Sequence, residues 1–224
     1  MKILRLRPGK ERSLLRRHPW VFESAIAKGG GDAGETVRIE SDEGKFLAWA
    51  AFSPHSKIRA RAWSFDRWVD SPPLTLESLR GKVVLIRWFN TGCHYCGNTL
   101  PALETLRTRY ANQGLVVIGV FHPKPIHDVS DALVRKTAHE LGFHGPLAVD
   151  EQWSTLDRWW LDGHPDRNWT SVSFLLDRDG IVRWVHGGGE YHPSTDPRHA
   201  SCDVRYAELE RTIRRLLDDR AAAR

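Results

Sequence analysis

Residues 83–103 read VVLIRWFNTGCHYCGNTLPAL, and this stretch gives the clearest indication of the fold. Its first residues form a continuous apolar run, which is typical of a strand covered on both faces. A cysteine pair with the spacing CxxC follows, and we expect a helix from about His94 to Tyr110. A strand, a CxxC pair and a helix in this order favour a redox-active pair, Cys93 and Cys96.

The two cysteines have different expected roles. Cys93 would lie at the N-terminus of the helix, where free backbone N–H groups and the helix dipole lower a thiol pKa from about 8.5 to roughly 3.5–7.5. Cys96 comes three residues later on the same helical face, so it can attack a mixed disulfide formed at Cys93. A protonated His94 would favour the Cys93 thiolate further. Half of a zinc site and two inert thiols are less favoured alternatives, because no second CxxC supplies the remaining zinc ligands.

Downstream of the cysteine pair, strand and helix patterns alternate. Leu115–Phe121 is a second apolar run and predicts another buried strand. The remaining predicted elements are a helix over 131–141, a strand over 147–149, a hairpin with strands over 173–176 and 181–185, and an amphipathic helix over 206–217. This order predicts an α/β fold in which helices flank a mixed sheet.

Four stretches carry a resemblance to a known family: Leu79–Ile86, Trp88–Cys96, Leu100–Leu103 and Phe174–Gly180. Through them most of residues 72–218 resembles the TlpA/ResA branch of the thioredoxin superfamily. Pro101 stands where that family kinks its active-site helix. The resemblance implies a thioredoxin-like fold and dithiol–disulfide exchange with protein or small-molecule thiols, without a cofactor.

Two departures from the family pattern affect the expected site. Ser171, preceded by Thr170, stands where the family usually has a cis-proline that faces the CxxC. A cis bond before a residue other than proline costs about 3–4 kcal/mol, so we expect this bond to be trans. Arg87 stands where thioredoxin keeps a buried acid, and a cation there would favour a thiolate.

The resemblance also implies roles for the residues around the cysteines. Cys93 and Cys96 are the catalytic pair that it implies. The residues expected to tune the redox chemistry are His94, Tyr95 and Arg87, and those expected to line a substrate groove are Trp88, Phe89, Thr170 and Ser171. Peroxidase is the nearest rival activity, but peroxiredoxins need a Thr or Ser and a Pro at positions that Asn90 and Ile86 occupy.

A histidine-rich segment follows the predicted hairpin, from His186 to His199, and Cys202 comes soon after. We favour a solvated glycine-rich loop with surface histidines, because the spacing matches no metal motif, and we expect His122 and His127 to be exposed as well. We therefore assign no metal. The alternative is a copper or zinc site, or a metal-delivery protein, using Cys93, Cys96, His192 and Cys202.

The N-terminal part of the chain is more basic than the rest. Residues 1–69 contain 14 Lys and Arg against 8 Asp and Glu, whereas residues 70–224 contain 19 against 20. Short strands and turns are predicted in the first part, and the paired prolines Pro72 and Pro73 predict an extended connector. We therefore expect two domains, a small β-rich pseudo-barrel over 1–69 and the thioredoxin-like domain over 70–224.

The first of these domains also resembles a known family. The stretches Lys10–Phe22, Gly34–Val37 and Ala51–Trp63 are similar to the PUA domain of RlmI-type 23S rRNA cytosine-5 methyltransferases. The resemblance implies contact with structured RNA, whereas methyltransferase activity is not expected because no cofactor-binding glycine motif follows. The RNA-contacting residues that we predict are Lys10, Arg12, Arg16, Arg17, His18, Trp20, Arg59 and Arg61. The alternatives are a basic surface without a ligand, and an RNA-binding protein whose thioredoxin-like part is a redox sensor or a structural appendage.

Composition excludes other classes of protein. Hydrophobic residues make up 41% and charged residues 27% of the 224 residues, which is an ordinary globular balance. No apolar run approaches a membrane span, and the basic N-terminus lacks the apolar core of a secretory signal. Three cysteines are too few for a disulfide framework. We therefore expect a cytoplasmic protein that does not associate with membranes.

Overall fold

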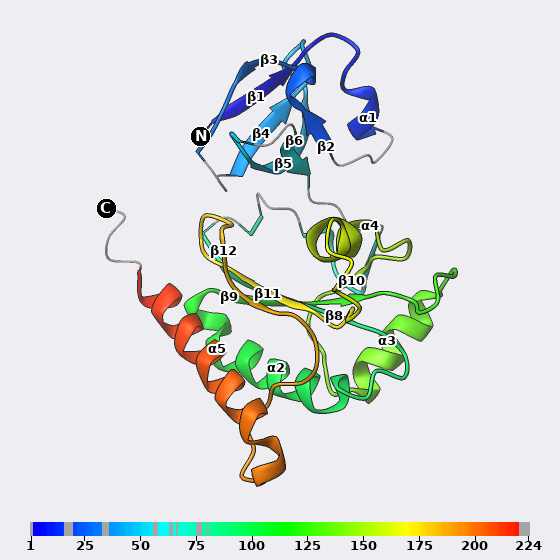
Figure 1. The fold of residues 1–224 in the computed structure, drawn as a ribbon, viewed down its shortest axis with the longest axis vertical. Coiled ribbons are helices and arrows are strands. Elements are labelled where there is room, and N and C mark those ends of the chain that lie inside the picture. Colours follow the sequence, from blue (N-terminus) through cyan, green and yellow to red (C-terminus); the bar gives the residue numbers. More distant parts are fainter. Residues whose placement is uncertain are drawn as a thin grey trace. The chain divides into compact units, whose positions relative to one another are not determined.

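The computed structural model describes residues 2–15, 20–32, 36–55, 58–62, 65, 67–74, 78–79 and 81–219. The chain divides into two compact units. The first is built mainly from residues up to 64, and the second mainly from residues 65 onward (Figure 1). Each unit has its own sheet and its own hydrophobic core.

The first unit is a β-rich module. Its described strands are β1 (Ile3–Leu6), β2 (Trp20–Phe22), β3 (Ile26–Gly29), β4 (Thr36–Glu40), β5 (Phe46–Phe52) and β6 (Ile58–Ala62), in the sheet order β2-β6-β5-β4-β1-β3. Strand β1 runs parallel to β4, and the other pairs are antiparallel. Helix α1 (Arg12–Leu15) and the 3₁₀ turn η1 (Glu23–Ala25) connect the strands. Alternating residues such as Leu4 and Leu6 of β1, with Val37 and Ile39 of β4, form the core.

The second unit has a mixed sheet in the order β12-β11-β8-β9-β10-β7. Its strands are β7 (Arg67–Val69), β8 (Val83–Phe89), β9 (Leu115–Phe121), β10 (Leu147–Val149), β11 (Ser173–Leu176) and β12 (Val182–His186). The central strands β8, β9 and β10 run parallel, and the outer ones are antiparallel to their neighbours. Strand β8 is buried at every residue, as its uninterrupted apolar pattern predicts.

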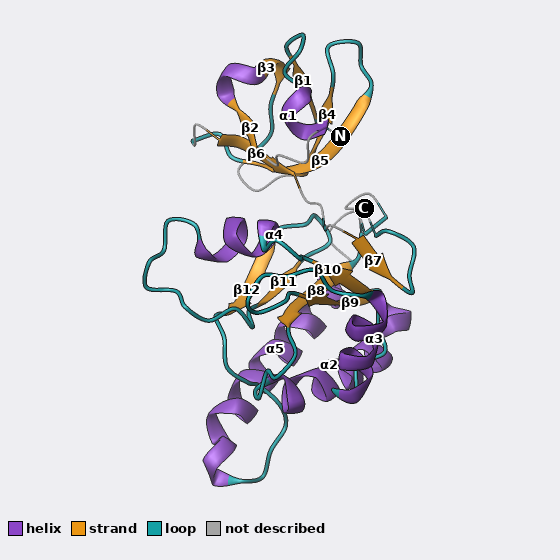
Figure 2. Cartoon of the chain, turned by 90° about the vertical axis from the view of Figure 1, so that its right-hand side faces the viewer, coloured by secondary structure: helices purple, strands orange, loops and turns teal. Residues whose placement is uncertain are grey.

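Helices cover the two faces of this sheet unequally. Helices α2 (Cys96–Tyr110), α3 (Asp131–Glu140) and α5 (Ala200–Asp218) lie on one face, where they share a core with Leu85 and Phe89 of β8 (Figures 1 and 2). The short helix α4 (Ser154–Leu156) and the π-helical turn η3 (Asp157–Leu161) lie on the other face. There Trp88 packs against Trp159 and Phe174. The fold class expected from the sequence, a helix-flanked mixed sheet preceded by a β-rich module, is confirmed.

Two elements differ from the sequence-based expectation. Strand β7 precedes the predicted connector but pairs with β10, so it belongs to the second sheet. Helix α5 begins at Ala200 and not at 206, and its buried Cys202 extends the apolar spacing of the predicted helix by one further turn. The 3₁₀ turn η4 (Pro197–His199) leads into α5, and the Asp196 carboxylate caps this turn by accepting from the Arg198 N–H at 2.9 Å.

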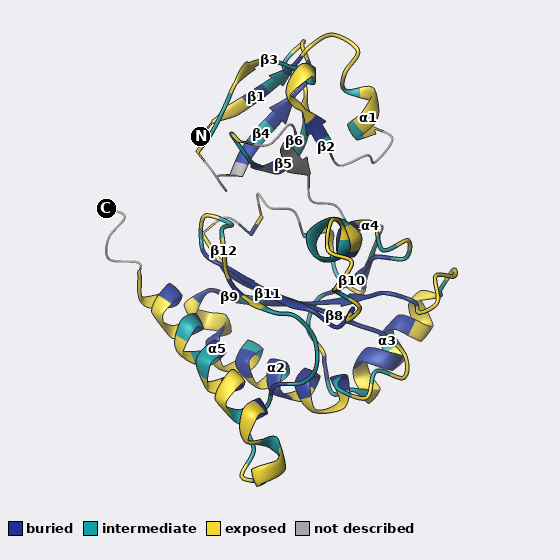
Figure 3. Cartoon of the chain, viewed as in Figure 1, coloured by how far each residue is buried: buried dark blue, intermediate teal, exposed yellow. Residues whose placement is uncertain are grey.

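Burial separates the two sides of each helix in the second unit (Figure 3). In α5 the buried residues include Cys202, Tyr206, Leu209 and Ile213, at the spacing of one helical face. In the described part of the chain, no helix combines the length and apolar character that crossing a membrane requires.

Candidate functional site

The cysteine pair lies where β8 passes into α2. Cys93 precedes the helix and Cys96 is its first residue, and the two sulfurs form a disulfide with an S–S distance of 2.09 Å. Cys96 is fully buried, whereas Cys93 is half-buried. The Cys96 N–H donates to the Cys93 carbonyl at 3.0 Å, which holds the CxxC turn against the helix. Cys93 is therefore the more accessible residue of the pair.

A hydroxyl group from a distant segment faces both sulfurs. The Ser171 Oγ lies 3.1 Å from the Cys93 Sγ and 3.8 Å from the Cys96 Sγ. Within the residues described, the cis peptide bond is Lys124–Pro125, so the Thr170–Ser171 bond is trans, as expected. The Trp88 N–H donates to the Val172 carbonyl at 3.0 Å and ties this segment to β8. Ser171 therefore places a hydroxyl group beside both sulfurs of the disulfide.

A buried histidine supports the same segment from β9. His122 follows β9 directly, and its Nε2 lies 3.2 Å from the Thr170 carbonyl oxygen. Burial lowers the pKa of His122 to about 3, so the ring is neutral near pH 7 and its Nε2–H donates to this carbonyl. The expectation that His122 is exposed was wrong, because the histidine continues the buried strand and packs on Trp153. The exposed position of His127 is confirmed.

Arg87 is fully buried on the helix-covered face of the sheet. Its guanidinium donates to the Gly189 carbonyl at 2.9 Å and to the Ser173 Oγ at 3.3 Å, and it lies over the Tyr191 ring. Desolvation lowers the pKa of Arg87, partly offset by Tyr191. Its described contacts do not include either cysteine, so a role in redox tuning stays a prediction.

Four aromatic residues near the cysteine pair differ in their burial. Trp88 and Phe89 are fully buried, so they support the motif and do not line a groove, contrary to expectation. The Trp88 Nε1–H donates to the Asp150 carboxylate at 3.1 Å. Tyr95 packs edge-on against Trp169, whose surface is 51% exposed. The exposed aromatic surface beside Cys93 therefore comes from Tyr95 and Trp169, and from the sequence Trp169 is expected only in the core or as groove lining.

A glycine permits Trp169 to take this position. Gly188 has φ +133°, and a Cβ at this position would lie 2.5 Å from the Trp169 Cβ. Side chains at that φ are strained, and the space is occupied as well. The loop after β12 therefore passes beneath Trp169 only because residue 188 is glycine.

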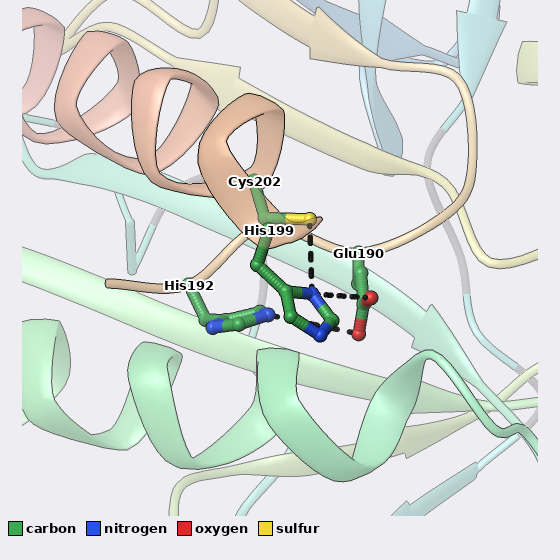
Figure 4. A group of neighbouring side chains, drawn as sticks. All are labelled: Glu190, His192, His199 and Cys202. Atoms are coloured by element: carbon green, nitrogen blue, oxygen red, sulfur yellow. Dashed lines mark hydrogen bonds and ion pairs between the residues drawn. The ribbon is translucent and has the colours of Figure 1, made fainter. Parts of the chain in front are cut away.

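The metal ligands considered from the sequence are not brought together as a group. Cys93 and Cys96 bond to each other. His192 and Cys202 instead join Glu190 and His199 in a separate cluster (Figure 4). The side chain of His192 is only 12% exposed, so the expectation of a loop with surface histidines was wrong at this position. The glycine-rich composition of the loop had favoured exposed histidines, so the burial of His192 was not predicted from the sequence.

The described residues of the expected RNA surface lie in the first unit. Lys10 and Arg12 are exposed, and Trp20 is half-buried on β2. Arg16, Arg17 and His18 lie outside the described residues, and Arg59 and Arg61 are described only as backbone positions of β6.

Comparisons with known proteins match the two parts of the chain separately. A PUA-like domain model matches residues 4–65, and the AhpC/TSA family model matches residues 62–185. The ribosomal RNA large subunit methyltransferase I of Pseudoalteromonas translucida is 59% identical over 63 residues, which are 27% of this chain and 16% of that protein. The chain thus spans only a small part of the curated relatives that it matches.

Two solved structures resemble the second unit. One is the solution structure of a proposed protein disulfide isomerase from Bacteroides thetaiotaomicron, with a TM-score of 0.54 and 21% identity, covering 69% of this chain and 86% of that chain. The other is a thioredoxin-family thiol:disulfide interchange protein from Chlorobium tepidum, with a TM-score of 0.51 and 19% identity, covering 69% and 92%. At these identities the likeness shows a thioredoxin-like fold. The chain carries a PUA-like domain at its N-terminal end, and by the match over residues 62–185 it belongs to the AhpC/TSA family.

Proposed function

We propose that this protein catalyses dithiol–disulfide exchange at Cys93 and Cys96. The observation that carries the proposal is the arrangement of the pair: a half-exposed sulfur and a buried sulfur in one disulfide at the start of α2. The helix N-terminus stabilises negative charge on Cys93 when the disulfide opens. Cys93 is therefore the thiolate that attacks a disulfide substrate, and it is also the thiolate that leaves when a mixed disulfide is resolved by a second substrate thiol.

The exchange needs no cofactor. A substrate thiolate attacks the Cys93 sulfur, the S–S bond breaks, and Cys96 leaves as a thiolate that takes up a proton. A second substrate thiolate then attacks the substrate sulfur of this mixed disulfide, and Cys93 leaves as a thiolate. The substrate has lost two electrons and the CxxC pair has gained them. In the reducing direction the same steps run backward, with Cys93 as the nucleophile and Cys96 as the resolving thiol.

The Ser171 hydroxyl faces the accessible sulfur, and the ring of Tyr95, within the CxxC motif, packs against Trp169. The Ser171 hydroxyl, 3.1 Å from the Cys93 Sγ, donates to the thiolate when the disulfide opens. Tyr95 and the exposed Trp169 offer apolar surface to the chain that carries the substrate thiol. Unfolded or extended protein substrates therefore suit this site better than small thiols.

The test is a redox titration of the full chain in glutathione buffers, read by thiol trapping, with insulin reduction measured in parallel. We expect one reversible two-electron couple and insulin reduction, and both should disappear in Cys93→Ser. The exposed Thr91, two residues upstream, provides the matched control Thr91→Ser, which should keep both. Failure of the wild-type pair to cycle, or hydrogen peroxide turnover without insulin reduction, would overturn the proposal.

A cytoplasmic setting is part of this proposal, and the potential tests it. A value near about −270 mV, as in thioredoxin, suits a reductant in the cytoplasm, whereas a value near about −120 mV, as in DsbA, suits an oxidant elsewhere. The titration therefore reports the direction of electron flow together with the activity.

The PUA-like domain favours a second candidate function, contact with structured RNA. Its curated relatives are methyltransferases of ribosomal RNA, and the exposed Lys10 and Arg12 provide cations for phosphate contacts. Methyl transfer is not part of the proposal. Filter binding of a ribosomal RNA hairpin at increasing salt should show affinity that falls with ionic strength and weakens in Lys10→Ala/Arg12→Ala. The control Lys136→Ala changes an exposed lysine of α3, and an equal loss there would contradict specific contact.

A further inference from the structure

Four side chains with metal-binding atoms converge between the loop after β12 and the start of α5. They are Glu190, His192, His199 and Cys202, and Figure 4 shows them directed toward one another. One ligand atom from each residue lies within 4.8 Å of the others. The cluster contains neither cysteine of the disulfide, so it is separate from the site proposed for thiol exchange.

The distances inside the cluster are close to those around a bound ion. The His199 Nδ1 lies 3.2 Å from the Glu190 Oε1 and 3.7 Å from the Cys202 Sγ. The His192 Nε2 lies 3.7 Å from the Glu190 Oε2. Zinc–nitrogen bonds of about 2.0–2.1 Å and a zinc–sulfur bond of about 2.3 Å place ligand atoms of a tetrahedron about 3.3–3.6 Å apart. Shifts of side-chain torsions within the cluster therefore suffice to close a tetrahedral shell.

His192 is oriented as a ligand. Its Nδ1 lies 3.0 Å from the Pro193 carbonyl oxygen, which fixes the proton on Nδ1 and leaves a lone pair on Nε2. That Nε2 is buried and has no hydrogen-bond partner within the described structure. A buried polar atom without a partner is costly, and a metal ion would satisfy it.

Glu190 is held in place by a residue of α2. The Asn98 Nδ2–H donates to the Glu190 Oε2 at 2.9 Å, which leaves Oε1 to face His199. An outer hydrogen bond of this kind orients a carboxylate ligand in known metal sites. It also connects the cluster to the helix that begins at Cys96.

We propose that Glu190, His192, His199 and Cys202 bind one Zn²⁺ ion in a closed, structural site. Two imidazoles, one thiolate and one carboxylate form a donor set that suits zinc, and four protein ligands leave no open position for substrate. The ion would tie the loop after β12 to the N-terminal turn of α5. Binding releases the proton of the Cys202 thiol, because the ligand is the thiolate.

The first experiment measures the metal in the full chain. The protein is purified without chelator, and zinc is quantified by mass spectrometry. We expect about one equivalent of zinc per chain. Replacing the zinc with Co²⁺ should produce the visible absorption of a tetrahedral site and a thiolate-to-cobalt charge-transfer band. Cys202→Ser should lose the charge-transfer band, and His192→Ala should weaken zinc affinity by at least about 100-fold.

Matched variants separate this site from other thiols and histidines. Cys93→Ser/Cys96→Ser should keep the zinc, since these sulfurs are not ligands. His139→Ala should also keep it, because His139 lies on α3 in a pair with His144 outside the cluster. Asn98→Ala should weaken binding by about tenfold without removing a ligand. Circular dichroism of each variant checks that the fold survives.

Three outcomes would overturn the proposal. The first is absence of zinc together with no Co²⁺ spectrum. The second is zinc that survives in Cys202→Ser and His192→Ala but leaves with Cys93 and Cys96. The third is selective uptake of copper with no affinity for zinc.

Discussion

Two places in the second unit combine cysteine with polar partners at the start of a helix, and they differ in what the rest of the chain supplies. At α2, Cys93 and Cys96 bond to each other, and a single hydroxyl, the Ser171 Oγ, faces them. At α5, Cys202 faces His199, with Glu190 and His192 beside it. The helix start is common to both places, so it does not by itself determine the chemistry.

The histidines show the same contrast. The Nε2 of His122, near the disulfide, donates to the Thr170 carbonyl oxygen, and its Nδ1 is buried without a hydrogen-bond partner among the described residues. The Nε2 of His192, near α5, is buried without a hydrogen-bond partner among the described residues. Each histidine therefore has a nitrogen with an unused lone pair, but among the described residues only His192 belongs to a group of side chains that could hold a metal ion. Four variants near the disulfide test the roles assigned to the residues of that site.

The largest effect is expected for Cys96→Ser, because it removes the resolving thiol. Cys93 should still attack a disulfide substrate, but the mixed disulfide should persist and turnover should stop. Intact-mass measurement after incubation with glutathione disulfide should show one glutathione adduct, and peptide mapping should place it on Cys93. Formation of the first adduct on Cys202 would contradict the role assigned to Cys93, because Cys202 would then be the more reactive thiol.

The next effect concerns stability in acid. The unfolded His122 takes up a proton near pH 6.5, whereas the folded side chain, with a pKa of about 3, does not. Stability is therefore fully present above pH 6.5 and is lost as the pH falls toward 3. Between pH 6.5 and about pH 4 this histidine alone should remove about 3 kcal/mol from the free energy of unfolding.

Urea denaturation at several pH values checks this loss. His122→Gln keeps an N–H for the Thr170 carbonyl but cannot titrate, so its stability should fall less steeply. His186, whose pKa burial lowers to about 4, contributes equally to both proteins. His127→Gln is the control, because this histidine is exposed in the same loop. Equal slopes for wild type and His122→Gln would show that His122 is not buried in its neutral form.

A smaller effect is expected for Ser171→Ala. Removing the hydroxyl that faces the Cys93 Sγ should raise the pKa of the Cys93 thiol by about one unit, or about 1.4 kcal/mol. The rate of alkylation by iodoacetamide as a function of pH measures this value. Ser173→Ala is the comparison variant, since the Ser173 Oγ contacts Arg87 and Tyr191 and not a sulfur. A pKa shift of the same size in Ser173→Ala would show that the shift does not depend on the contact between the Ser171 hydroxyl and the Cys93 sulfur.

The smallest effect is expected for Trp169→Ala. The loss of its exposed ring beside Tyr95 should raise the KM for insulin by about fivefold, or about 1 kcal/mol. The KM for a small disulfide such as hydroxyethyl disulfide should change much less, because it does not reach the ring. Val204→Ala changes an apolar residue of α5 that is 61% exposed and serves as the control. A parallel loss for both substrates would mean that Trp169 supports the fold of the site and not substrate binding.

Local patterns were sufficient for most of the secondary structure. The apolar runs predicted β8 and β9, and the turn at 177–180 predicted the β11–β12 hairpin. The same patterns predicted that α5 begins at Tyr206 instead of Ala200, and they did not indicate that the buried run of β9 continues into His122. Burial of a single polar residue depends on what packs over it, and here that is Trp153, 31 positions further along the chain.

Three features could be predicted from the amino-acid sequence alone: the α/β class of the second unit, the β-rich module before it, and the placement of the cysteine pair at a helix start. These features depend on residues that are neighbours in the chain, so the spacing of apolar side chains and the CxxC is enough to predict them. Two other features depend on the tertiary fold. Ser171 faces Cys93 across a separation of 78 positions, and Glu190 and Cys202 lie together with two histidines. Such contacts require strand pairing between β8 and β11 and the return of the loop after β12 to α5, and no local pattern encodes that geometry.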